Sequence, residues 1–187
     1  MLNDIFSFLK SLVSAPKQET AEEFIEKFAR ATPLTYEEVD RMKDELRLTT
    51  PKAVHATLLV HVYGIHLALL GTAARKLIQH TDRAAFETSI LSRYIDASLK
   101  KLGVTGNAHG LYQEMSHQMK EMDAEFYANT NDTNGPFFAV TKRFLRITCG
   151  KDSTDIAVML GIAGSIGNHM KSTAGMFDGL YENGYRF

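Results

Sequence analysis

The chain has 187 residues, of which 44% are hydrophobic and 23% charged, which is enough apolar material for one domain with a buried core. Its 21 basic and 22 acidic residues give a net charge of −1, so it lacks the basic field that a nucleic-acid-binding protein normally carries. The single cysteine, Cys149, excludes a disulfide framework within the chain.

The first fifteen residues predict an amphipathic arm, residues 1–15, which the Pro-containing segment "SAPKQE" joins to the rest of the chain. Its polar face carries only Lys10, whereas helices that lie on membranes are usually rich in basic side chains. We therefore expect the arm to contact its own bundle or a second subunit, and no membrane. Since no basic region precedes it, we expect no secretory signal and a cytoplasmic location. The apolar side chains expected at an interface are Ile5, Phe6, Leu9 and Leu12.

Helix-start and helix-stop signals divide the chain from residue 16 onward. Capping boxes at 20–23 and 35–38 predict short helices at about 20–31 and 35–47. No segment alternates with period 2, so no strand is predicted. We expect an all-α, single-domain bundle of about six to eight helices over 16–178, followed by an aromatic tail at 179–187. The remaining helices are expected at about 51–79, 82–102, 108–129, 136–148 and 153–178.

The predicted helix 51–79 is nearly uncharged. Its 22 residues from Ala53 to Ala74 carry no formal charge, which is long enough to cross a bilayer. Three histidines within it and the polarity of the other segments favour the central helix of a bundle instead. One face holds small residues and predicts a tight helix crossing: Thr57, Gly64, Ala68, Gly71 and Thr72.

The histidines of this helix are candidates for a ligand pocket. His61 lies beside the small-residue face, so we expect it to be the most buried. With His66 and Tyr63 it forms the candidate pocket, and it is also the candidate axial ligand for a haem, although no Cys-x-x-Cys-His attachment motif occurs. Three other histidines fall near helix ends or on polar faces and are expected to be structural: His80, His109 and His169.

The predicted helix 108–129 contains the Glu-x-x-His spacing of di-metal carboxylate bundles. Glu114, His117 and Glu121 share one face and are the candidate metal ligands. This face points away from the stripe of apolar residues that must be buried, and the chain offers no second Glu-x-x-His. The favoured interpretation is therefore a solvated helix face, with metal binding as the alternative.

The last predicted helix carries a heptad-like apolar seam, which is typical of helix–helix association. Its glycines follow no strand and lack the Gly-Lys-Ser/Thr ending, so they predict packing and not a phosphate loop. The seam residues expected at an interface are Ile156, Leu160, Ala163, Gly167 and Met170.

The sequence thus favours a helical interaction or sensory protein that associates with itself, as a homodimer. The first alternative is a metal- or haem-binding bundle with sensor or redox activity, and the second is a bundle that binds a small molecule or lipid. No catalytic constellation is evident, so no enzymatic activity and no particular cofactor are predicted.

Overall fold

The computed structural model describes residues 20–79, 81–131, 135–150 and 155–187, and these residues form α-helices and no strands. This confirms the all-α bundle. The arm with Ile5, Phe6, Leu9 and Leu12, and also His80, lie outside the described residues. The helices are α2 (Ala21–Ala31), α3 (Tyr36–Leu46), α4 (Thr50–Leu69), α5 (Thr72–Leu77), α6 (Arg83–Lys101), α7 (Ala108–Ala128), α8 (Pro136–Cys149) and α9 (Ile156–Glu182).

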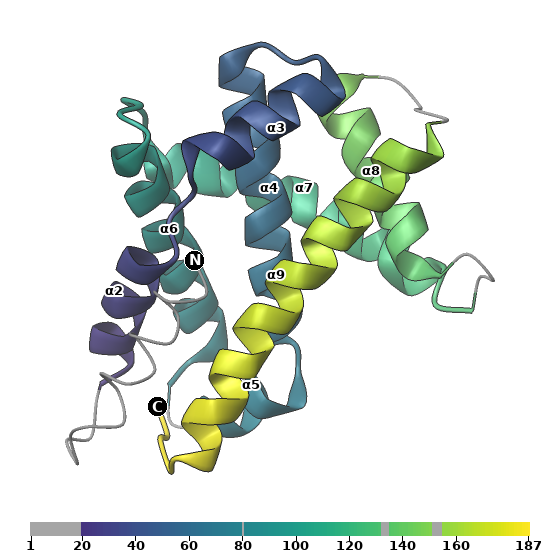
Figure 1. The fold of residues 1–187 in the computed structure, drawn as a ribbon. Coiled ribbons are helices and arrows are strands. Elements are labelled where there is room, and N and C mark those ends of the chain that lie inside the picture. The colour runs from purple at the N-terminus through teal and green to yellow at the C-terminus, as the bar shows by residue number, and fades with distance from the viewer. Residues whose placement is uncertain (1–19, 80, 132–134, 151–154) are drawn as a thin grey trace.

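Helix α4 occupies the centre of the bundle (Figure 1). It contacts α3, α6 and α7 and packs most extensively against α9, while α2 lies along α6 and α8 lies between α7 and α9. Nearly every residue of α4 after its first turn is buried. Among the described helices α4 alone is long and apolar enough to span a membrane, and 89% of that stretch is buried inside the bundle, as a central core helix requires.

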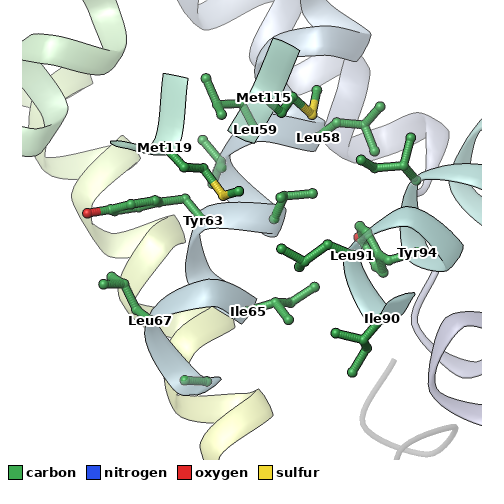
Figure 2. Close-up of a cluster of buried hydrophobic side chains, with 14 of the residues drawn as sticks. Leu58, Leu59, Tyr63, Ile65, Leu67, Ile90, Leu91, Tyr94, Met115 and Met119 are labelled. Carbon is green, nitrogen blue, oxygen red and sulfur yellow. The ribbon is translucent and has the colours of Figure 1, made fainter. Parts of the chain in front are cut away.

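The side chains of α4 that face α6 and α7 form a continuous core. Figure 2 shows Leu91 and Tyr94 of α6 beside Ile65 of α4, and Met115 and Met119 of α7 over the opposite end of the same cluster. All five of these side chains are buried. The methionines belong to the stripe predicted on the helix at 108–129, so this face of α7 is confirmed as its buried side.

Two helix boundaries differ from the predicted ones. The predicted helix 51–79 is divided into α4 and α5, because Gly71 takes an extended conformation and becomes the N-terminal cap of α5. The bend lets α5 pack against α9. Helix α9 continues past the predicted end near 178 to Glu182. Both capping boxes form as predicted.

The tight crossing predicted for the small-residue face occurs at Gly64. A Cβ atom added there would lie 2.6 Å from the Cβ of His169 and 3.0 Å from the backbone oxygen of Ile166, both on α9. Real Cβ atoms do not approach other atoms so closely, so only glycine lets α4 and α9 meet at this distance. The crossing brings the turn of α4 that holds His61 next to His169.

The predicted seam of α9 does not stay on one surface. Ile156 and Leu160 are 64% and 62% exposed, whereas Met170 packs against the core of its own chain. The aromatic tail also folds back on the bundle. Phe187 is buried, its ring centroid lies 5.2 Å from that of Phe24, and its backbone N–H donates to the Leu77 carbonyl.

Replacing Gly64 with alanine tests the crossing. We expect Gly64→Ala to lower the free energy of unfolding by about 1–3 kcal/mol, because the added methyl group collides with backbone and Cβ atoms of α9. Gly175→Ala, at an exposed position in the second half of α9, is the matched control. A Cβ there meets nothing within 4 Å, so alanine should raise stability by up to about 1 kcal/mol through helix propensity alone. Urea unfolding followed by circular dichroism measures both, and equal stability of Gly64→Ala and the wild type would contradict the tight crossing.

Candidate functional site

Three side chains with metal-ligating atoms converge from three different helices. Glu38 of α3, His61 of α4 and His169 of α9 each offer one such atom, and the three atoms lie within 4.8 Å of one another. The Nε2 atom of His61 is 3.6 Å from Oε1 of Glu38, and the two imidazole ring centroids are 3.5 Å apart. We call this group the Glu38–His61–His169 cluster. It is the only group of this kind among the residues that the structure describes.

Glu38 is held in place by the cap of its own helix. Its Oε2 atom accepts hydrogen bonds from the backbone N–H of Thr35 at 2.9 Å and from the Thr35 hydroxyl at 3.0 Å. The other oxygen, Oε1, faces His61. The capping box therefore orients the carboxylate while leaving one of its oxygens available to a ligand. The side chain is only 15% exposed, which is low for a carboxylate.

His61 is oriented by a tyrosine on a neighbouring helix. Its Nδ1 atom is 2.6 Å from the hydroxyl of Tyr94, which is itself buried. Burial raises the pKa of Tyr94 above its ordinary range, as does the nearby charge of Glu38, and a hydrogen bond to Ser98 opposes this. The phenol therefore stays protonated. Because Nδ1 is engaged by Tyr94, only Nε2 of His61 is free to bind a metal ion. When Nε2 binds a metal ion, the ring proton lies on Nδ1 and is donated to the Tyr94 oxygen.

Both imidazoles of the cluster are neutral near pH 7. Burial holds the pKa of His61 well below its ordinary value, and His169 and the charge of Arg41 act in the same direction. Burial also lowers the pKa of His169, while the charge of Glu38 opposes this and that of Arg41 adds to it. Neutral imidazole is the form that binds metal ions. The two rings therefore require no deprotonation step at neutral pH.

The ring nitrogens of His169 have no hydrogen-bond partner among the residues that the structure describes. His169 is partly buried and its ring packs against that of His61, yet it makes no hydrogen bond to any described residue. Polar atoms in such places usually have a partner in the protein, in ordered water or in a ligand. An imidazole that is positioned by packing and has no hydrogen bond to a described residue is therefore suited to bind a metal ion or another ligand.

The cluster opens on a cavity with a volume of about 910 Å³. Helix α2 and its connection to α3 form one side, and α3, α4, α6 and α9 form the others. Its apolar wall includes Phe28, Ile65 and Met176, and Tyr94 and Arg41 also line it. Arg41 donates to Ser165 at 3.2 Å. An ion held at the cluster would be reachable from this cavity.

The pocket residues expected from the sequence are divided between two places. His61 lies in the cluster and is 4% exposed, in accord with its expected burial. His66 and Tyr63 face α6 and α7 instead, because they are on another side of α4. His66 bonds Glu87 through Nδ1 at 2.5 Å and Asp123 through Nε2 at 2.9 Å. Tyr63 donates to the same aspartate at 3.1 Å.

His66, Glu87 and Asp123 form ionic hydrogen bonds that connect α4, α6 and α7. Burial alone would lower the pKa of His66, but hydrogen bonds to Asp123 and Glu87 and the charges of both carboxylates outweigh it and raise the pKa to about 9. Both ring nitrogens therefore carry protons and donate them, which leaves no lone pair for a metal ion or a haem iron. The group is a structural ion network between α4, α6 and α7.

The candidate metal ligands on α7 do not converge. The side chain of His117 is 78% exposed and that of Glu114 59% exposed. Glu121 pairs with Arg143 of α8 at 2.8 Å, whereas Glu114 turns toward His55 of α4, 3.9 Å away. His117 stays near Glu121, with its Nε2 atom 3.7 Å from Oε1, but Glu114 does not join them, so the expected trio forms no group of three ligand atoms among the described residues.

Sequence reasoning missed two members of the cluster. Glu38 was explained by its place as the third residue of a capping box, so it was not considered as a metal ligand. His169 was expected on a polar face or near a helix end, and this was wrong: it lies in the middle of α9 at the crossing with Gly64. The available signal was the small-residue face of α4, because whatever α9 places opposite Gly64 must lie close to His61.

No protein family, curated protein or solved structure matches this chain.

The His66 network makes stability depend on pH. The pKa is about 9 in the folded state and 6.5 in an unfolded chain, so the folded state binds more protons between these values. Its stabilising effect is complete below pH 6.5 and is lost as the pH rises through 9, by about 3 kcal/mol in total. Urea unfolding across this range should show the loss in the wild type and not in His66→Gln, which carries no titrating group. Parallel curves for the two proteins would contradict the raised pKa.

Proposed function

We propose that the protein binds a divalent transition-metal ion through Glu38, His61 and His169. The observation that carries this proposal is the convergence of two neutral imidazoles and one carboxylate from three helices within 4.8 Å. Two histidines and a carboxylate are the protein ligands of many catalytic zinc sites and of non-haem iron(II) sites. Imidazole ligands favour such ions over calcium or magnesium, which prefer oxygen.

Small movements of side chains bring the cluster to ligand geometry. Metal–ligand bonds of about 2.0–2.1 Å in a tetrahedral site place ligand atoms about 3.3 Å apart. The separations within the cluster reach 4.8 Å at most, so closure requires shifts of about 1.5 Å or less. Oε1 of Glu38 and the ring nitrogens of His169 make no hydrogen bond to a described residue that would oppose this movement. Tyr94 keeps His61 oriented, in the way that outer-shell hydrogen bonds orient metal ligands.

A single ion suits the cluster better than a haem does. An axial histidine needs open space beyond its free nitrogen for the porphyrin ring. Here Nε2 of His61 faces the Glu38 carboxylate at 3.6 Å, and the ring of His169 lies against the ring of His61. Three protein ligands leave positions on an ion free for water or for a molecule in the adjoining cavity. We therefore propose a metal-dependent ligand-binding protein, of the kind that serves as a sensor or as the scaffold of a metal-assisted reaction.

Replacing the carboxylate of Glu38 with an amide tests its role in metal binding without disturbing the fold. We expect Glu38→Gln to weaken Zn²⁺ binding by more than 100-fold, since losing a ligand costs more than the roughly 10–100-fold lost with an outer-shell partner. Glutamine still serves at the third position of a capping box, so the unfolding midpoint without metal should stay near that of the wild type. Isothermal titration calorimetry with Zn²⁺ and thermal unfolding measure the two quantities.

Glu114→Gln is the matched control, because Glu114 belongs to the Glu-x-x-His sequence of α7 and is largely exposed. It should bind Zn²⁺ as the wild type does. Equal affinity of Glu38→Gln and the wild type, or loss of affinity in Glu114→Gln alone, would contradict the proposed site.

We also propose self-association through the first half of α9 as a second candidate function. Ile156 and Leu160 are large apolar side chains at adjacent turns of one helix and are largely exposed. Gly164 next to them is exposed and permits another helix to approach closely. Exposed apolar groups of this kind mark association surfaces when they are contiguous. A second copy of the chain fits an uncharged, small-residue helix face through symmetric packing.

Light scattering over a concentration series tests this second candidate. We expect the wild type to form dimers and Leu160→Glu to remain monomeric, because a carboxylate buried at the interface would lack a partner. Val104→Glu is the control, since Val104 is also exposed, at 40%, but lies in the connection after α6. A monomeric wild type at all concentrations would eliminate the candidate.

A further inference from the structure

The cavity beside the Glu38–His61–His169 cluster is much larger than a metal ion and its water ligands require. Its volume of about 910 Å³ lies within the range of sites for organic molecules, which is roughly 300–1,000 Å³. Phe28 of α2, Ile65 of α4 and Met176 of α9 give it an apolar wall built from buried side chains. This wall can cover the hydrocarbon part of a ligand.

The charged groups of the cavity favour an anion. Arg30, Arg41 and Lys101 outnumber the two lining carboxylates, Glu37 and Glu38. Glu38 is already engaged by the helix cap and faces His61, so it does not neutralise these cations directly.

Arg41 is the cation best placed to hold such a group. Its only hydrogen bond to a described residue is to the neutral hydroxyl of Ser165, and no carboxylate among those residues lies within ion-pair distance of it. Arg30, in contrast, pairs with Glu26 at 3.5 Å. A guanidinium that lines a cavity without an anionic partner offers two parallel N–H donors, which match the two oxygens of a carboxylate.

We infer that this cavity binds an organic carboxylate with an apolar body, with the carboxylate at Arg41 and the hydrocarbon against Phe28, Ile65 and Met176. Lys101, which has no ion pair within the described part of the chain, adds long-range attraction at the rim. The inference goes beyond metal binding and does not require it, because the apolar wall and Arg41 are present whether or not an ion occupies the cluster.

A series of three probes separates the contributions of charge and hydrocarbon. Octanoate has both, acetate has only the carboxylate, and octylammonium has the same hydrocarbon with the opposite charge. Calorimetric titration of the metal-free full chain should show binding of octanoate, at least about tenfold weaker binding of acetate, and no binding of octylammonium. Equal binding of octanoate and octylammonium would overturn the inference.

The variant Arg41→Gln tests whether Arg41 binds the carboxylate of the ligand. Because Arg41 is exposed, the variant should fold, and its affinity for octanoate should fall roughly tenfold or more through loss of a charge-assisted hydrogen bond. Lys43→Gln removes a charge from the same helix at a position that does not line the cavity, and it should leave the affinity unchanged. An unchanged affinity in Arg41→Gln, or an equal loss in both variants, would overturn the assignment of the carboxylate to Arg41.

Methyl NMR of the methionines locates the probe. Octanoate should shift the methyl resonance of Met176 and leave that of Met115 unchanged, since Met115 lies in the core between α4 and α7. A shift of Met115 alone would place the probe elsewhere and overturn the inference.

Repeating the titration with Zn²⁺ present distinguishes this inference from the proposed metal site. Octanoate binding that depends on Arg41, in a protein that fails to bind Zn²⁺, supports the inference and contradicts the metal site. Zn²⁺ binding that depends on Glu38, without octanoate binding, does the reverse.

Discussion

The close approach of α4 and α9 at Gly64 is the constraint on which the rest of the site depends. His61 lies one turn before Gly64 on α4, and the Cβ of His169 is the atom that a side chain at Gly64 would strike. The packing of α4 against α9, the most extensive contact between two described helices, therefore also brings the centroids of the two imidazole rings to 3.5 Å. Protein interiors are close-packed and repack only at a cost, so a change at this crossing moves the ligand atoms as well as the helices.

The other groups of the site are held by interactions that also stabilise the fold. Thr35 and Glu38 form the cap of α3, and the same carboxylate supplies an oxygen to the cluster. Tyr94 fills the core between α4 and α6 and also binds Nδ1 of His61. Such double use gives a preorganised site, because the side chains are fixed before any ligand arrives. It also places the site on rigid helices and not on mobile loops.

The helices could be predicted because their signals are local. Capping boxes and the apolar stripe of α7 each depend on residues within a few positions of one another, and the structure has both. The division between α4 and α5 was missed because apolar periodicity continues through Gly71, and only the packing of α5 on α9 decides that the chain bends there.

The site was less predictable because its members are far apart in sequence. The Glu-x-x-His spacing on α7 was a local signal that did not lead to a site, since Glu114 turns toward His55 of α4 and His117 is largely exposed. The cluster has no local signal, because Glu38, His61 and His169 meet only through the crossing angles of three helices. The apolar pattern of α4 predicted that His61 would be buried, but it could not predict that Glu38 and His169 would be its partners.

Long-range proton–nitrogen NMR of the histidine rings, recorded with and without Zn²⁺, tests the metal site most directly. The chain has seven histidines, and single substitutions assign their resonances. We expect Zn²⁺ to shift the ring nitrogens of His61 and His169 alone, with Nε2 of His61 bound and its Nδ1 still protonated toward Tyr94. Unchanged spectra of these two residues, or shifts confined to the exposed His117, would contradict a metal site at the crossing of α4 and α9.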